Sequence, residues 1–341
     1  MKLGERLVLD SSLTDANMAY LKQLGANYLT VAFLELATDE PTGKSALSGL
    51  RLGEYFKTED LAALKKWVES RGFELTAIGT SPFRNWEKIM LGQPGRDEQI
   101  ENWNKSLKNM GKAGIPQLQY SWMLNAGAWI PLWRTSAENA GRGGAKIVRF
   151  DYEVARKAPI TGYGQISEET MWNNLTYFLK AVIPVAEESG VQMVMHPCDP
   201  QVPGIAGIAR IIRSIESYDR VFKIINSKAN GMTFCFGCFA QMLDVPGVYR
   251  AIRHFGRQGR IGYVHFRGVR GTLEKFDEVF PDEGKLDMVK ALKVLKEVGY
   301  DGIVQPDHAP HTTGDTEYGH ISHAFQIGYL KGCLQGAGAL E

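Results

Sequence analysis

The sequence predicts an α/β protein of the (β/α)8 TIM-barrel class. Short apolar runs alternate with amphipathic helical stretches eight times along the 341 residues, and this alternation is typical of a parallel sheet. The sequence lacks the glycine fingerprint that normally follows the first strand of an open dinucleotide-binding sheet. Eight units without that fingerprint favour a closed barrel over an open sheet.

The expected strands are rich in β-branched and aromatic residues, and they cover residues 7–9, 28–33, 73–78, 117–122, 191–196, 232–235, 261–265 and 302–307. The expected helices cover residues 12–25, 58–72, 94–114, 168–190, 205–227, a stretch beginning at 245, 286–299, and 321 to the end. We expect a single domain over residues 1–341, with a loop insertion at 37–52. A longer insertion at about 125–165 could be a lid over the rim or an oligomer contact.

Composition excludes several classes of partner. The net charge is +1 and no basic face stands out, so neither nucleic acid nor an anionic membrane is expected. No apolar run approaches the roughly 20 residues needed to cross a bilayer. The four cysteines are too few for a disulfide framework, and the first residues lack the apolar core of a signal peptide. We expect a cytoplasmic protein acting on a small molecule.

Four consecutive strands end on a side chain that binds metals. These residues, His196, Cys235, His265 and Asp307, are 39, 30 and 42 positions apart, each about one strand-plus-helix unit. The corresponding ends of parallel barrel strands meet at one rim, so the four side chains should converge there as a divalent-metal site. Strand parity agrees, because residues of opposite parity are nearly all apolar and should face the helices.

Each of these residues alone has an ordinary structural explanation. A single strand-end histidine is more often a hydrogen-bonded core residue, and a lone cysteine is usually a small buried hydrophobe. The joint pattern favours the metal site, in which Cys238, three residues after Cys235, is incidental. The donor set leaves Zn²⁺, Fe²⁺ and Mn²⁺ open.

Further candidates follow the same strand ends. His308 is either a partner of the ligands or a general base beside the metal. Tyr318 could donate a proton over the barrel mouth, although an exposed loop tyrosine is the simpler interpretation. His320 and His323 could equally form a helix–loop contact. Arg267 and Arg270 could either bind a substrate carboxylate or lie at the barrel rim in contact with solvent.

Several longer motifs, in the same order, resemble the mannonate dehydratase family. They are residues 91–102 (LGQPGRDEQIEN), 133–135 (WRT), 149–151 (RFD), 229–235 (ANGMTFC), 264–267 (VHFR), 286–288 (LDM), 306–308 (PDH) and 318–319 (YG). The resemblance implies a (β/α)8 fold with a Mn²⁺-type metal on the four strand-end residues. It also implies an acid–base pair at His308 and Tyr318, and loss of water from a sugar acid to give a 2-keto-3-deoxy acid.

The chain departs from this family at several substrate-facing stretches. The first strand lacks the family's RWFG, and residues 82–86 (PFRNW) replace a histidine-containing segment. Residues 122–126 do not match NFMP, residues 276–278 read FDE in place of FHE, and residues 196–199 read HPCD in place of HPDD. We therefore expect either D-mannonate or a related sugar acid as substrate, with Trp133 and Arg84 as further substrate-binding residues.

Two alternatives remain open at the level of sequence. The same metal site could serve a sugar isomerase or epimerase of the xylose-isomerase-like superfamily, or the chain could be a non-catalytic sugar-binding barrel. We also expect a homo-oligomer, as is common for barrels with long rim loops.

Overall fold

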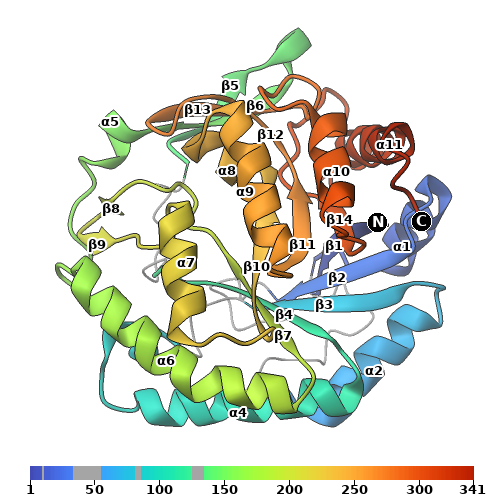
Figure 1. Cartoon of the computed structure of the whole chain (residues 1–341). Coiled ribbons are helices and arrows are strands. Elements are labelled where there is room, and N and C mark those ends of the chain that lie inside the picture. Colours follow the sequence, from blue (N-terminus) through green and yellow to red (C-terminus); the bar gives the residue numbers. More distant parts are fainter. Residues whose placement is uncertain (10, 34–54, 81–85, 125–133) are drawn as a thin grey trace.

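Eight parallel strands close into a barrel surrounded by helices, which confirms the predicted fold class (Figure 1). This computed structural model describes residues 1–9, 11–33, 55–80, 86–124 and 134–341. The strand order around the ring is β1-β14-β11-β10-β7-β4-β3-β2. The strands that carry the four candidate ligands, β7, β10, β11 and β14, are therefore adjacent.

All eight predicted strands are present in the barrel. They are β1 (Lys2–Val8), β2 (Tyr28–Phe33), β3 (Glu74–Thr80), β4 (Gln117–Ser121), β7 (Gln192–His196), β10 (Asn230–Cys235), β11 (Ile261–Phe266) and β14 (Ile303–Pro306). The expected start of the first strand at residue 7 was wrong, because β1 begins at Lys2. Gly4, Glu5 and Arg6 interrupt the apolar pattern that identified the strand.

Helices follow the strands on the outside of the barrel. They are α1 (Asp15–Leu24), α2 (Thr58–Glu69), α4 (Arg96–Ala113), α6 (Glu168–Glu188), α7 (Ile215–Ile224), α9 (Val245–Arg257), α10 (Met288–Glu297) and α11 (His320–Gly336), with the short α3 (Glu87–Leu91), α5 (Tyr152–Ala155) and α8 (Phe236–Met242). Thr14, Ser167, Asp244 and Asp287 cap α1, α6, α9 and α10 by accepting a hydrogen bond from a backbone N–H in the first turn.

The helix expected over residues 205–227 was wrong in its first ten residues. Instead β8 (Gly204–Ile205) and β9 (Ile208–Ala209) form a small hairpin, whose turn places Ala206 and Gly207 at φ 53° and 85°. The helix α7 begins only after Ser214, which forms a reciprocal capping box with Ser217. The isoleucines of this segment suggested the buried face of a helix by their spacing. They are buried in the structure, but in the hairpin and the loop that follows it.

The region expected as an insertion supplies half of a second sheet. Two of its strands, β5 (Ser136–Ala140) and β6 (Lys146–Asp151), join β12 (Gly268–Gly271) and β13 (Lys275–Val279). The four strands are antiparallel in the order β12-β13-β6-β5. Residues 125–133 and the expected loop insertion at 37–52 lie outside the described residues.

The barrel interior contains both apolar and polar layers. Ala77, Val194, Tyr263 and Ile303 form a small buried cluster separate from the main core. Nearby, Thr30 Oγ1 donates a hydrogen bond to Gln305 Oε1 over 2.9 Å. These contacts agree with the predicted strand parity, since Val194, Tyr263 and Gln305 share parity with the ligands at the ends of their strands.

The two ends of the chain lie side by side (Figure 1). The Met1 ammonium donates to the Ala339 carbonyl over 2.6 Å, and Glu341 N–H donates to Met1 O over 3.0 Å.

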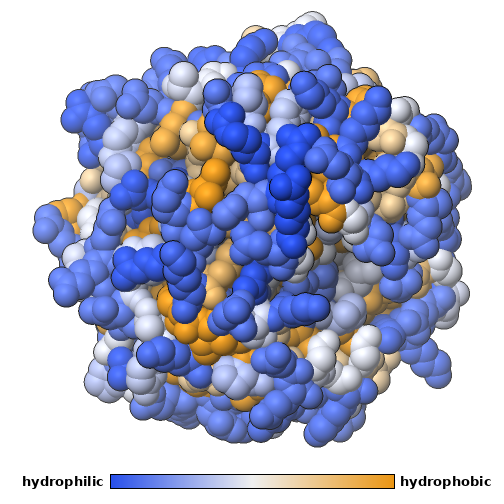
Figure 2. Space-filling model, viewed as in Figure 1, coloured by the Kyte–Doolittle hydropathy of each residue, from blue (hydrophilic) through white to orange (hydrophobic). Residues whose placement is uncertain are grey.

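The face of the molecule seen in Figure 2 is mostly hydrophilic, with apolar residues visible between the hydrophilic ones. None of the helices in the described ranges is both long and apolar enough for a transmembrane segment.

Candidate metal centre and active site

The structure brings His196, Cys235, His265 and Asp307 together at one end of the barrel. His196 and Cys235 are the last residues of β7 and β10, His265 lies beside Cys235 on β11, and Asp307 directly follows β14. One potential ligand atom from each residue lies within 4.8 Å of the others, and all four residues are buried. The expected convergence is therefore observed, whereas their role as metal ligands stays a prediction.

The hydrogen bonds around these residues fit a cation. The Nδ1 of His196 lies 2.8 Å from the Pro197 carbonyl, so Nδ1–H donates there and Nε2 carries the lone pair. His265 Nδ1 approaches Asp307 Oδ2 to 3.4 Å. Even so, neither buried nitrogen of His265 has a hydrogen-bond partner among the described residues. Unsatisfied buried nitrogens are costly, and a bound cation would satisfy one of them.

Electrostatics favours the ionised ligands. Burial alone would raise the pKa of the Cys235 thiol, but Cys238, Arg267 and the neighbouring imidazoles hold it well below its usual range. Burial also opposes ionisation of Asp307, yet His265 and His308 keep the pKa of its carboxyl well below the ordinary value. A thiolate and a carboxylate are the forms that bind a divalent cation. The four residues therefore fit the predicted metal in chemistry and in placement.

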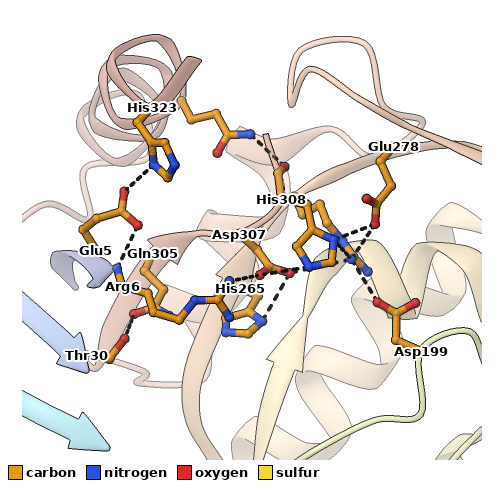
Figure 3. A network of polar contacts seen from close by, with 12 residues as sticks. Glu5, Arg6, Thr30, Asp199, His265, Glu278, Gln305, Asp307, His308 and His323 are labelled. Carbon is orange, nitrogen blue, oxygen red and sulfur yellow. Dashed lines mark hydrogen bonds and ion pairs between the residues drawn. The ribbon is translucent and has the colours of Figure 1, made fainter. Parts of the chain in front are cut away.

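A second cluster of Asp199, Glu278 and His308 lies next to the first (Figure 3). The guanidinium groups of two arginines donate hydrogen bonds to its carboxylates. Arg267 Nη1 donates to Asp199 Oδ2 and Glu278 Oε1 over 3.0 and 2.7 Å, and Arg134 donates to the same two oxygens. Two guanidinium groups already balance the two carboxylates, so this cluster is a buried ion-pair network and a poor site for a cation.

The arginines set the charge state of this network. Burial would raise the pKa values of Asp199 and Glu278. Arg134 and Arg267 outweigh that effect, so the pKa of Asp199 lies well below its usual range and that of Glu278 falls to about 2. His308 also contributes to the lowering at Glu278. Both carboxylates are therefore ionised at neutral pH.

His308 connects the two clusters. Its Nδ1 lies 2.8 Å from Glu278 Oε1, and its Nε2 lies 3.7 Å from Asp307 Oδ1. The ring therefore presents one nitrogen to the ion-pair network and the other to the candidate ligands. Gln326 of α11 donates to the His308 carbonyl over 2.9 Å and anchors the loop that carries the ring.

Tyr318 is half-buried and its hydroxyl is buried, so the simpler interpretation of an exposed loop tyrosine was wrong. Its ring stacks on His323 with centroids 4.6 Å apart, and the rings of His320 and Tyr20 meet it edge-on. Its hydroxyl is buried and has no hydrogen-bond partner in the part of the chain that the structure describes. Burial first, and then the charge of Glu5, raise the pKa of this hydroxyl.

The remaining candidate residues, which were expected to bind substrate, differ in their positions. Arg267 is fully buried with its charge matched by protein carboxylates. The expectation of a solvated rim position was therefore wrong for it, and its matched charge does not favour the predicted role in binding a substrate carboxylate. Arg270 is exposed on β12, where its Nη2 lies 3.8 Å from Asp277 Oδ2, and it does not join either cluster. Trp133 and Arg84 lie outside the described residues.

Several residues of this site were not predicted from the sequence. Glu278 and Asp199 were noted only as parts of departing motifs, although buried carboxylates beside a histidine are a signal for an orienting partner. Arg6 was not considered because it lies on β1 before residue 7, where that strand was expected to begin. Its side chain is about one-third exposed, and its Nη2 lies 3.4 Å from Asp307 Oδ1.

Comparisons with known proteins agree with this geometry. The family model described as D-mannonate dehydratase (UxuA) matches residues 20–160 and 154–339. A mannonate dehydratase of Streptococcus agalactiae is 33% identical over 322 residues, covering 85% of this chain and 90% of that protein. A mannonate dehydratase of Oceanobacillus iheyensis is 31% identical over 331 residues, covering 86% and 89%.

Solved structures give the same grouping. The crystal structure of mannonate dehydratase from Streptococcus suis serotype 2 is similar with a TM-score of 0.80 and 28% identity, covering 100% of this chain and 97% of that chain. An L-ribulose 3-epimerase matches with a TM-score of 0.60 and 13% identity, covering 99% and 96%. At that identity the second likeness shows the barrel fold alone.

Proposed function

The chain belongs to the D-mannonate dehydratase (UxuA) family, and from this premise we propose that it removes water from D-mannonate or a related sugar acid. The reaction takes a proton from the carbon beside the carboxylate and hydroxide from the next carbon. The resulting enol becomes the ketone of a 2-keto-3-deoxy acid. The observation that carries the proposal is the convergence of four donor side chains beside His308.

We assign His196, Cys235, His265 and Asp307 as the residues that would hold a divalent cation of the Mn²⁺ type, with Fe²⁺ or Zn²⁺ as alternatives. The bound cation would supply electrostatic stabilisation of the negative charge that builds up beside the carboxylate. A reducing compartment such as the cytoplasm would keep the Cys235 thiol available for this role.

His308 is the general base in this proposal. Its Nδ1 lies 2.8 Å from both Glu278 Oε1 and Arg267 Nη1. In this proposal Nδ1–H donates to the ionised Glu278 carboxylate, which holds the ring in one orientation. Nε2 then carries the lone pair and faces the ligand cluster, where it can take the proton from carbon. Arg134 and Arg267 keep Glu278 ionised and in place, so they position the base without touching substrate.

Tyr318 is the general acid. Its raised pKa keeps the hydroxyl protonated at neutral pH, which is the state needed to donate a proton to departing hydroxide. Since no described side chain accepts a hydrogen bond from this hydroxyl, its donor is available to a substrate oxygen.

Arg6 is the candidate group for the substrate carboxylate. It lies beside Asp307 with its side chain partly exposed, whereas the charges of Arg134 and Arg267 are already matched. An arginine can hold a carboxylate through two parallel hydrogen bonds. A cationic group at this position favours a sugar acid over the neutral sugar that an isomerase or epimerase would use.

Turnover of a panel of sugar acids by the Mn²⁺-loaded protein tests the proposal. We expect a 2-keto-3-deoxy acid from D-mannonate or a close relative. We also expect loss of about 10²- to 10⁴-fold in kcat in His308→Asn with unchanged metal content, because the general base is removed. Release of no such product from any sugar acid would exclude this function, and interconversion of neutral sugars would favour the isomerase alternative. Homo-oligomerisation stays a prediction.

A further inference from the structure

We propose that Glu5 and His323 form an ion pair that holds the Tyr318 ring in its working position. Neither was assigned a role in binding metal or substrate. The inference rests on the proposed function, in which Tyr318 is the proton donor. Glu5 and His323 would be positioning residues, because they act through Tyr318 and not on substrate.

Glu5 carries a buried carboxylate. It lies on β1 and is only 1% exposed. One carboxylate oxygen, Oε1, accepts a hydrogen bond from the Arg6 backbone over 2.7 Å. The other, Oε2, lies 3.3 Å from His323 Nδ1 on α11 (Figure 3). A buried carboxylate needs a counter-charge, and the pair with His323 provides one.

His323 faces charged and aromatic groups from several elements. They are Glu5 and Arg6 of β1, Asp315 in the loop before α11, and the Tyr318 ring. The guanidinium of Arg6 approaches Asp307 instead of the Glu5 carboxylate. Burial lowers the pKa of His323, but the charge and hydrogen bond of Glu5 outweigh burial and Arg6 and raise it above its ordinary value.

The His323 ring packs directly against the Tyr318 ring. The two rings are stacked within 8° of parallel at 4.6 Å, and a protonated imidazole over the face of a phenol is attractive. His320 and Tyr20 close the other sides of the Tyr318 ring. The ring is thus held on three sides while its hydroxyl keeps its hydrogen-bonding capacity for substrate.

The decisive experiment compares Glu5→Gln and His323→Gln with the wild-type protein, alone and in a Tyr318→Phe background. We expect each single variant to lower kcat by about 10- to 100-fold, because a small misplacement of a catalytic group is costly. KM and metal content should change little. In the Tyr318→Phe background neither substitution should lower kcat further, since the group being positioned is already absent.

A second readout does not depend on turnover. Imidazole NMR, with the His323 signal assigned from its loss in His323→Gln, should show the pKa of His323 falling in Glu5→Gln. A matched control is His254→Gln on α9, which removes a histidine that pairs with Asp219 over 2.7 Å on the outer helices. It should leave kcat and the His323 signal unchanged.

The outcomes separate the inference from the proposed function. Full kcat in Glu5→Gln, additive losses with Tyr318→Phe, or an unmoved His323 pKa would each overturn the positioning role while the dehydratase stands. If the metal-loaded wild-type protein turns over no sugar acid, the proposed function fails. The positioning role then fails with it, even with the expected NMR shift.

Discussion

Glu278 shows how one side chain couples the stability of this molecule to its proposed chemistry. It accepts hydrogen bonds from two buried guanidinium groups and holds the ring of His308. Removal of one partner from a buried ion-pair network leaves the others without their counter-charge. Stability and activity should therefore change together at this residue.

Glu278→Gln should lower the free energy of unfolding by about 3–5 kcal/mol, because Arg134 and Arg267 then share only Asp199. It should also lower kcat, since His308 loses its ionised partner. Urea unfolding and steady-state kinetics at pH 7 measure the two effects. Glu138→Gln, which removes an exposed ion pair with Lys146, should leave both within error.

The same residue predicts a pH dependence of stability. The pKa of Glu278 is about 2 in the fold against an ordinary value of 4.5, so its contribution is fully present above pH 4.5. It should be lost as pH falls from 4.5 towards 2, because the unfolded chain binds the proton first. Unfolding free energies at a series of pH values in this window should fall less steeply in Glu278→Gln. Equal slopes in the two proteins would contradict this prediction.

At the scale of elements, α7 tests whether local sequence sets where a helix begins. Ser214 accepts a hydrogen bond from Ser217 N–H, and Ser217 Oγ accepts one from Ser214 N–H. Ser214→Ala should therefore lower the free energy of unfolding by about 1 kcal/mol. Ser189→Ala at the end of α6, where the backbone N–H of Ser189 makes the cap bonds, is the matched control. Wild-type stability in Ser214→Ala would show that packing alone sets this helix start.

The elements also show what the sequence could and could not predict. Strand composition and spacing were enough to place four ligand-type residues at one rim, because parallel barrel strands share their direction. The ion-pair network was not predictable in this way. Arg134 and Glu278 are 144 positions apart. They meet because the backbone next to Arg134 pairs with Arg149 of β6, which in turn pairs with Asp277 of β13. No local pattern encodes that pairing.

Burial explains the remaining errors in the site. Arg267 follows a strand and was therefore expected at the rim, either solvated or binding a substrate carboxylate. It is instead fully buried, and its Nη2 donates to Cys238 Sγ of α8 over 3.3 Å. Tyr318 lies in a glycine-flanked loop that is typical of exposed residues, yet rings from α1 and α11 enclose it. In both cases elements distant in sequence decide the environment of the residue.

At the scale of the whole molecule, the candidate ligands join four adjacent strands of the closed barrel. A cation bound there would stabilise the folded state by about 2.7 kcal/mol at a free concentration one hundred times its Kd. Thermal unfolding should therefore occur several degrees higher with Mn²⁺ than after chelation. Cys235→Ser should lose most of this difference, and equal Tm values for metal-loaded and chelated wild-type protein would contradict the prediction.

The most direct test is anomalous X-ray diffraction from crystals of the Mn²⁺-loaded protein, measured on both sides of the metal's absorption edge. We predict one strong peak enclosed by His196, Cys235, His265 and Asp307, about 2.0–2.4 Å from a donor atom of each. No peak there, or a peak at Asp199, Glu278 and His308 instead, would contradict the assignment on which the proposed function depends.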